Sequence, residues 1–406
     1  MGSTQLVVQG LSFVTGIMIV RRLPVAEYAY YTIGTSMLSM MQILSEAGIV
    51  PGVIAQGGRV WQDKVELGKV VATGAALRRW FALLSLLVVP VMLRLLLNHG
   101  ASWTTALLIL ACMIPTYISS LTDSLLEVAP KLHQAIAPLQ RNQIETAASR
   151  AVFTVISLFT WPTCALSLLA TGLARGWANI RLRKIVVQYA DRTQKPDKQY
   201  QRNILKVVWR ILPESVYYCF SSQITVWAIS IFGSTASVGK LGGLTGLTQA
   251  TALLTALITT LMVPRYARLP DKKPLLIQRF LMSQVALLLL GLLVTGAAAL
   301  FHTQILWVLG HQFDGLKEEL TLAFASASMT LMNVTTNQLL SSRGLVVPPA
   351  ILIGFAIITQ VGLAFVMPLQ TVSGALLYGL YTALCLYAIR FVYFFLQMRN
   401  HQEAAA

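Results

Sequence analysis

The sequence predicts an all-α, polytopic membrane protein with about twelve transmembrane helices in two six-helix lobes. The first observation is composition: 56% of the 406 residues are hydrophobic and only 11% are charged, whereas a soluble domain carries about 25% charged residues. The second is that apolar runs recur along the whole chain, each long enough to cross a hydrocarbon core of roughly 30 Å. Because that core holds no water, the runs must form helices that satisfy their own backbone groups.

Hydropathy places six spans in each half of the chain. The first six are expected over residues 4–20, 28–50, 80–97, 103–125, 144–160 and 163–180. The second six are expected over residues 207–232, 238–263, 275–301, 320–340, 347–367 and 372–397. The fifth and sixth spans are short and share the hairpin Trp161-Pro162, so a re-entrant pair is the alternative there.

The distribution of basic residues predicts the orientation and the domain boundaries. With both termini inside, all but five of the 31 Lys and Arg fall on one side; the exceptions are Arg21, Arg22, Arg94, Lys240 and Lys317. The positive-inside rule assigns the basic side to the cytoplasm. The densest basic stretch lies between the sixth and seventh spans, so that six spans precede it and six follow. It predicts an N-lobe over residues 1–180, a basic cytoplasmic linker over 181–206 and a C-lobe over 207–406.

Several function classes receive no support from the sequence. The net charge of +16 follows from membrane insertion and attracts anionic lipid headgroups, so we expect membrane lipids and no nucleic acid as partners. Cysteines and histidines show no metal-ligand spacing, and no nucleotide-binding motif is present. We therefore predict no cofactor, no metal and no catalytic residues. The first apolar run lacks a basic segment before it and leads into a second span, so we expect no cleavable signal peptide.

Polar side chains form stripes within several apolar spans. Spans one, two, seven, eight and ten carry the candidate cavity residues Gln5, Gln9, Ser39, Gln42, Tyr218, Gln223, Thr248 and Asn333. Such residues either join helices by hydrogen bonds or line a water-filled chamber. Since the stripes occur in corresponding spans of both halves, we favour a central chamber between the lobes.

Charged residues inside spans give a sharper signal, because a buried ion costs several kcal/mol unless it is paired or hydrated. Arg150 and Arg210 are candidate substrate-binding residues, and Glu46, Asp123 and Glu214 are candidates for ion coupling. For those near a span end, snorkelling to the interface is the alternative. A cationic cluster open to a chamber would suit a phosphate-bearing substrate, because Arg binds phosphate through two parallel hydrogen bonds.

Short motifs at the span ends resemble those of bacterial polysaccharide transporters, the lipid-linked oligosaccharide and O-antigen flippases of the multidrug/oligosaccharidyl-lipid/polysaccharide (MOP) superfamily. They are Arg-Arg-Leu-Pro-Val-Ala-Glu-Tyr-Ala-Tyr-Tyr over residues 21–31, Glu-Ala-Gly over 46–48, Ile-Leu-Pro over 211–213 and Met-Val-Pro-Arg over 262–265. The resemblance implies a V-shaped, MATE-like pair of lobes around a cavity lined by spans one, two, seven and eight. It also implies that alternating access moves a polyprenyl-diphosphate-linked oligosaccharide between leaflets of the bacterial inner membrane, beside polysaccharide polymerase or assembly proteins.

The sequence leaves two other functions open. A cation-coupled multidrug exporter of the same superfamily would require a net anionic cavity. A membrane-embedded glycan ligase or polymerase would require catalytic groups on a sizeable outer loop, whereas the longest outer connection is only about residues 302–319.

Overall fold

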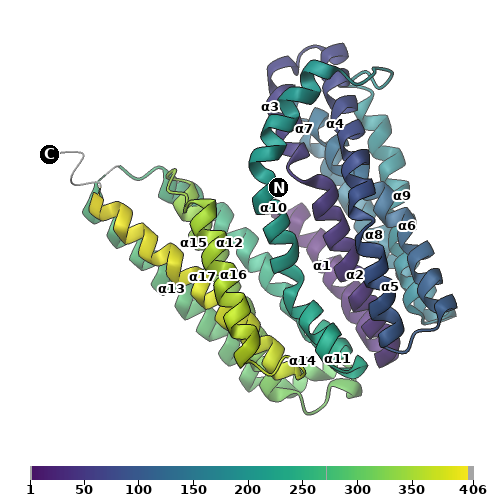
Figure 1. Ribbon diagram of the computed structural model, residues 1–406, viewed down its shortest axis with the longest axis vertical. Coiled ribbons are helices and arrows are strands. Elements are labelled where there is room, and N and C mark those ends of the chain that lie inside the picture. The colour runs from purple at the N-terminus through teal and green to yellow at the C-terminus, as the bar shows by residue number, and fades with distance from the viewer. Residues whose placement is uncertain (1, 271, 401–406) are drawn as a thin grey trace. The chain divides into compact units, whose positions relative to one another are not determined.

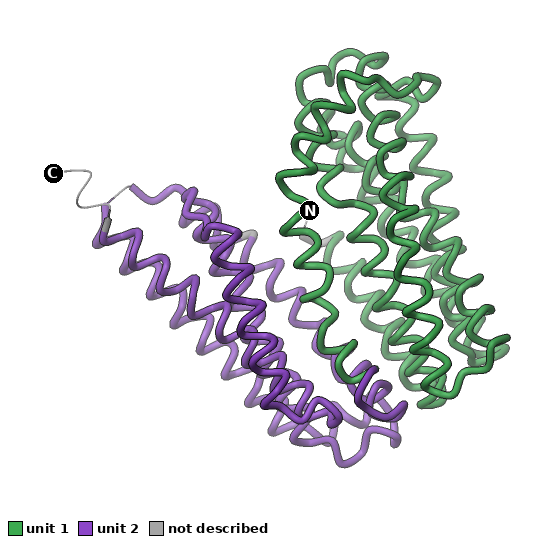
Figure 2. Tube along the Cα trace, viewed as in Figure 1, with its two compact units in different colours: residues 1–230 green, residues 231–406 purple. Residues whose placement is uncertain are grey.

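Helices make up the whole of the regular structure in the computed structural model, which describes residues 2–270 and 272–400. No strand occurs within those ranges (Figure 1). The all-α fold class predicted from composition and hydropathy is therefore confirmed. The chain forms two compact units, Met1–Ser230 and Ile231–Ala406 (Figure 2). These units are defined by contacts between residues and not by repeats in the sequence. The lobes expected over residues 1–180 and 207–406 therefore stay a prediction.

Ten helices in the described part of the chain begin in the first unit. They are α1 (Gly2–Arg22), α2 (Val25–Glu46), α3 (Ile49–Val60), α4 (Lys64–Ser85), α5 (Val88–Asn98), α6 (Trp103–Leu126), α7 (Val128–Leu132), α8 (Ile136–Thr160), α9 (Cys164–Val186) and α10 (Lys198–Phe232). The break between α2 and α3 lies at Ala47 and Gly48, whose φ angles are 40° and 81°. A left-handed backbone favours glycine, which accounts for Gly48 at the break.

The second unit contains α11 (Thr235–Thr248), α12 (Ala250–Ala267), α13 (Lys273–Leu300), α14 (His302–Leu309), the 3-10 helix η1 (His311–Phe313), α15 (Lys317–Ser341), α16 (Pro349–Val366) and α17 (Val372–Asn400). Helix α15 packs against α12, α13 and α17. Phe280 of α13 stacks on Phe394 of α17 with ring centroids 3.9 Å apart. This aromatic contact forms part of the apolar core of the second unit.

Each of the twelve predicted spans corresponds to one helix or to two consecutive helices. Eight helical segments in the described residues are long and apolar enough to cross a membrane, and the spans over α8, α9, α10 and α15 are more polar helices. Six tryptophans near the ends of the predicted spans project outward and are 49–71% exposed; they are Trp80, Trp103, Trp161, Trp177, Trp209 and Trp307. The chain is thus a multi-pass membrane protein.

The short fifth and sixth predicted spans lie within two longer helices. Helix α8 has 25 residues and α9 has 23, so at about 1.5 Å per residue each is long enough to cross the hydrocarbon core. The apolar part of each helix is short because charged residues occupy the first part of α8 and the last turns of α9. Hydropathy marked only the apolar portion of each helix.

Close approach of α6 and α9 depends on Gly172. A Cβ at this position would lie 2.9 Å from Pro115 Cβ and 3.0 Å from the backbone nitrogen of Thr116. One turn further along α9, a Cβ on Gly176 would meet only Ser119 Oγ at 3.8 Å. These two glycines therefore differ in what an added methyl group would encounter, although both lie inside the same helix.

Gly172→Ala and Gly176→Ala should shift stability in opposite directions. Overpacking at Gly172 costs about 1–3 kcal/mol, more than the gain of about 1 kcal/mol from replacing glycine in a helix. At Gly176 only that gain applies. We expect the thermal unfolding midpoint of the detergent-purified protein to fall for Gly172→Ala and to rise slightly for Gly176→Ala. Equal shifts would contradict the packing described for α6 and α9.

The basic connection between α9 and α10 is fastened to α4. The backbone N–H of Asp191 donates to the Lys64 carbonyl at 2.9 Å, and that of Asp197 donates to Thr73 Oγ1 at 2.9 Å. Hydrogen bonds from Gln194 and Thr193 hold the pKa of Asp191 below its usual value. The connection is therefore an ordered part of the first unit.

Candidate functional site

A charged cavity of about 390 Å³ lies within the first unit and is walled by α1, α2, α4, α6, α8 and α9. Most of its lining positions carry polar or charged side chains. The charged ones are Glu46, Arg78, Asp123, Glu127, Arg150 and Arg175. Four of the residues predicted from the sequence meet here, namely Gln42, Glu46, Asp123 and Arg150.

Arg78 of α4 is the most deeply buried cation of the cavity, with 3% of its side chain exposed. It donates a hydrogen bond to Ser124 Oγ of α6, and its Nη2 lies 3.7 Å from Glu46 Oε2 of α2. Its Nε is buried and has no hydrogen-bond partner among the described residues. Arg78 thus links three helices and does not snorkel to the interface.

Asp123 of α6 is held by an amide from α9. Asn179 Nδ2 donates to Asp123 Oδ1 and also lies 2.7 Å from Thr122 Oγ1. On its other side, Asn179 Oδ1 accepts a 2.8 Å hydrogen bond from Arg183 Nε. This chain of hydrogen bonds fixes the orientation of the carboxylate at the cavity wall.

Arg150 of α8 and Arg175 of α9 face the cavity from adjacent helices. Arg175 lies within electrostatic range of both Asp123 and Arg150, and Arg150 Nε is buried without a partner among the described residues. Two neighbouring guanidinium groups repel each other, and a buried donor left unpaired costs about 1–3 kcal/mol. An anion in the cavity would relieve both penalties.

The charge balance of the cavity is positive. Glu127 forms a 2.7 Å ion pair with Lys131, outside the lining. Glu46 and Asp123 then remain as the acids that face three arginines. Arginine forms bidentate hydrogen bonds with phosphate and carboxylate, so the arrangement can bind an anionic group.

The other candidates of α1, α2 and α10 lie outside this lining. Gln5 is exposed and Gln9 is partly exposed on α1. Ser39 donates to the Thr35 carbonyl at 2.9 Å. Gln223 of α10 accepts a 2.6 Å hydrogen bond from Ser36 of α2. Three further candidates on α10 are exposed, namely Arg210, Glu214 and Tyr218.

The two candidates in the second unit make contacts within that unit. Thr248 donates to the Thr245 carbonyl at 2.9 Å, and Asn333 is buried and accepts a hydrogen bond from Arg390. Thr336, on the same helix as Asn333, donates to Gln284 Oε1 at 3.0 Å. Much of the polar stripe of span ten therefore serves helix packing, the alternative weighed from the sequence.

Sequence reasoning missed Arg175 and Asn179 as site residues. Both residues lie within the sixth predicted span, over residues 163–180, where neither belongs to a polar stripe shared by the two halves. The signal that could have found them is their spacing of four, which places both on one face of a helix. That face is the one α9 presents to α6 and to the cavity.

Comparisons with known proteins identify the fold. No protein-family model matches the chain, and no curated protein matches its sequence. Among solved structures, the inward-facing conformation of a multidrug resistance MATE family transporter of the MOP superfamily is similar over 98% of this chain and 96% of its own, with a TM-score of 0.73 and 14% identity.

Two further structures extend the similarity. A Vibrio cholerae MATE transporter gives a TM-score of 0.58 at 15% identity over 98% of this chain and 99% of its own. A MOP superfamily transporter from Pyrococcus furiosus gives 0.54 at 13% identity over 96% and 94%. The chain therefore has the fold of the MATE transporters of the MOP superfamily.

Proposed function

We propose that this chain is a membrane transporter that moves a polyprenyl-diphosphate-linked oligosaccharide from the inner to the outer leaflet by alternating access. The shared fold, found in transporters along nearly the full length of this chain, supports transport. Bundles of helices that rock around a midplane site provide such access in secondary transporters. The lipid tail would stay in the bilayer throughout and would not enter water.

The observation that carries the choice of substrate is the arginine-rich cavity of the first unit. Arg78, Arg150 and Arg175 line it, and Arg78 and Arg150 each hold a buried Nε without a partner among the described residues. A diphosphate offers several acceptor oxygens and negative charge, which complement these donors. Gln42 and Ser12 add neutral hydrogen-bonding groups to the same lining, which suits sugar hydroxyls.

A cation-coupled multidrug exporter is the second candidate. It is favoured by solved structures of this fold that are described as multidrug resistance transporters, and by Glu46 and Asp123 in the cavity. The Pyrococcus furiosus transporter is described as having a binding pocket of reverse polarity, which suggests a different function for that protein. Because arginines outnumber the available acids here, we favour an anionic substrate.

The location and partners follow from the proposed substrate and the charge distribution. The excess of Lys and Arg on one side supports a bacterial inner membrane protein with both termini in the cytoplasm. Glycan polymerases or assembly proteins on the outer side would receive the translocated product. Glu46, Asp123 and Glu214 are the acidic groups proposed for ion coupling.

Leaflet exposure of a fluorescent polyprenyl-diphosphate oligosaccharide in proteoliposomes tests the proposal. We expect exposure in vesicles with the protein and none in protein-free vesicles, while a cationic dye is not moved. Arg279→Gln, an exposed basic position of α13 in the second unit, serves as a matched control with unchanged rate. Dye transport without exposure of the lipid-linked sugar would establish the exporter instead.

A further inference from the structure

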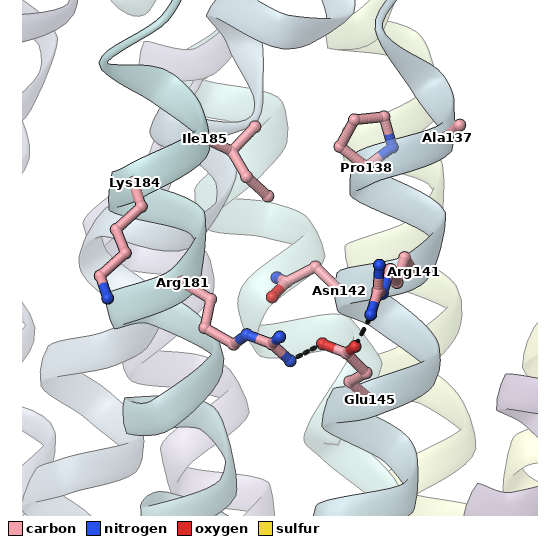
Figure 3. A pocket seen from close by; sticks show the side chains of 8 residues that line it. All are labelled: Ala137, Pro138, Arg141, Asn142, Glu145, Arg181, Lys184 and Ile185. Atoms are coloured by element: carbon pink, nitrogen blue, oxygen red, sulfur yellow. Dashed lines mark hydrogen bonds and ion pairs between the residues drawn. The ribbon is translucent and has the colours of Figure 1, made fainter.

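A second hollow, outside the arginine-rich cavity, lies between the basic ends of α8 and α9. This α8–α9 groove has a volume of about 600 Å³. Its charged residues are Arg141 and Glu145 of α8 together with Arg181 and Lys184 of α9 (Figure 3). Apolar atoms of Ala137, Pro138 and Ile185 complete much of the wall.

Glu145 holds two arginines at the groove. Arg141 Nε donates to Glu145 Oε1 at 3.0 Å, and Arg181 reaches across from α9 to Glu145 Oε2 (Figure 3). The arginine side chains remain 78% and 40% exposed, respectively. One carboxylate thus orients two guanidinium groups while leaving other N–H donors of each available.

Lys184 adds a third cation to the groove. It is exposed and forms no ion pair with any described residue. Three cations therefore face one carboxylate, and the groove carries a net positive charge. This charge complements a phosphate group rather than a cation or a neutral sugar.

Exposed apolar side chains continue from the groove along both helices. On α8 they are Val152, Ile156 and Phe159, and on α9 they are Leu173, Trp177 and Ile180. Each is about half exposed or more, as expected for surfaces that face lipid. Arg181 lies over the Trp177 ring at 5.6 Å, and tryptophan prefers the headgroup level of a bilayer. We therefore expect the cations of the groove to lie at the depth of lipid phosphates.

We propose that the α8–α9 groove binds an anionic phospholipid of the leaflet that adjoins the basic ends of these helices. Arg141, Arg181 and Lys184 hold its phosphodiester, and its acyl chains lie along the apolar stripes of α8 and α9. Basic pockets between transmembrane helices recognise lipid headgroups in this way. The bound lipid is a resident of the membrane, distinct from the transported substrate proposed for the cavity of the first unit.

Binding of phosphatidylglycerol to the full chain in neutral detergent tests this inference. Each basic residue near the headgroups contributes about a fivefold gain in binding to anionic lipid. We expect the dissociation constant to rise about fivefold for Lys184→Gln and about 25-fold for Arg141→Gln/Lys184→Gln. Lys184 forms no ion pair within residues 2–270 and 272–400, so its variant should fold as the unaltered chain does.

Control variants and competing ligands separate this site from general attraction. Arg202→Gln, an exposed basic position of α10, should bind phosphatidylglycerol as the unaltered chain does. Phosphatidylcholine should bind weakly, and inorganic phosphate should not compete at equal concentration because it lacks acyl chains. The proposal is overturned if the groove variants bind normally, if Arg202→Gln loses as much affinity as Lys184→Gln, or if either comparison ligand matches phosphatidylglycerol.

Discussion

Replacing Arg150 by glutamine is expected to slow translocation of a lipid-linked diphosphate substrate by about ten- to a hundredfold. The guanidinium of Arg150 lines the charged cavity and holds a buried Nε without a partner among the described residues. A hydrogen bond from a charged group contributes about 1.5–3 kcal/mol, and each 1.4 kcal/mol corresponds to about a tenfold change. The measurement is the initial rate of leaflet exposure in proteoliposomes containing equal amounts of folded protein.

The charge-conserving variant distinguishes binding from folding. Arg150→Lys should recover part of the rate, because lysine keeps the charge but loses the planar pair of donors that suits phosphate. Arg210→Gln, exposed on α10 outside the cavity lining, should have a smaller effect than Arg150→Gln. A normal rate for Arg150→Gln would show that the arginine cavity does not bind the substrate.

Replacing Arg78 by leucine is expected to destabilise the first unit strongly. Arg78 is 3% exposed, donates to Ser124 and lies 3.7 Å from Glu46. Removing one partner of a buried ion pair costs about 3–5 kcal/mol, because the other charge is left uncompensated. Exposure of part of Glu46 to the cavity would reduce this cost toward the lower value. The measurement is the thermal unfolding midpoint in detergent.

Arg79→Leu provides the matched control for Arg78→Leu. The two arginines are adjacent on α4, yet Arg79 is exposed. Its side chain can reach the interface, and surface substitutions usually change stability by within about 0.5 kcal/mol. A large fall in the unfolding midpoint for Arg78→Leu alone is therefore predicted. Similar midpoints for the two variants would contradict the role of Arg78 as an internal link between helices.

Hydropathy and charge predicted the helical architecture well, because the bilayer leaves the chain few alternatives. Each predicted span has its helical counterpart. The sequence was less informative about helix length. The ends of α8 and α9 are polar and helical at once, and Arg141, Glu145 and Arg181 stabilise them through ion pairs that a hydropathy window cannot detect.

The candidate site could be predicted only in part. Gln42, Glu46, Asp123 and Arg150 converge on one cavity, as intramembrane polar groups should when they avoid lipid. Asn333 looked equivalent in sequence, but Arg390 engages it within the second unit. Which polar face meets a cavity and which meets another helix depends on helix rotation. Rotation is set by packing across the bundle, so neither spacing nor composition reveals it.

The most direct test of the central claim is chemical access to the arginine-lined cavity. A single cysteine at Gln42 in the cavity wall and one at Ile156 on the lipid-facing side of α8 should be compared with a charged, membrane-impermeant thiol reagent. The four native cysteines are first replaced by serine or alanine. We predict rapid labelling of Gln42→Cys, protection by a polyprenyl-diphosphate oligosaccharide, and little labelling of Ile156→Cys. Absence of labelling at Gln42→Cys, or labelling that the substrate does not slow, would contradict a hydrated substrate-binding cavity in the first unit.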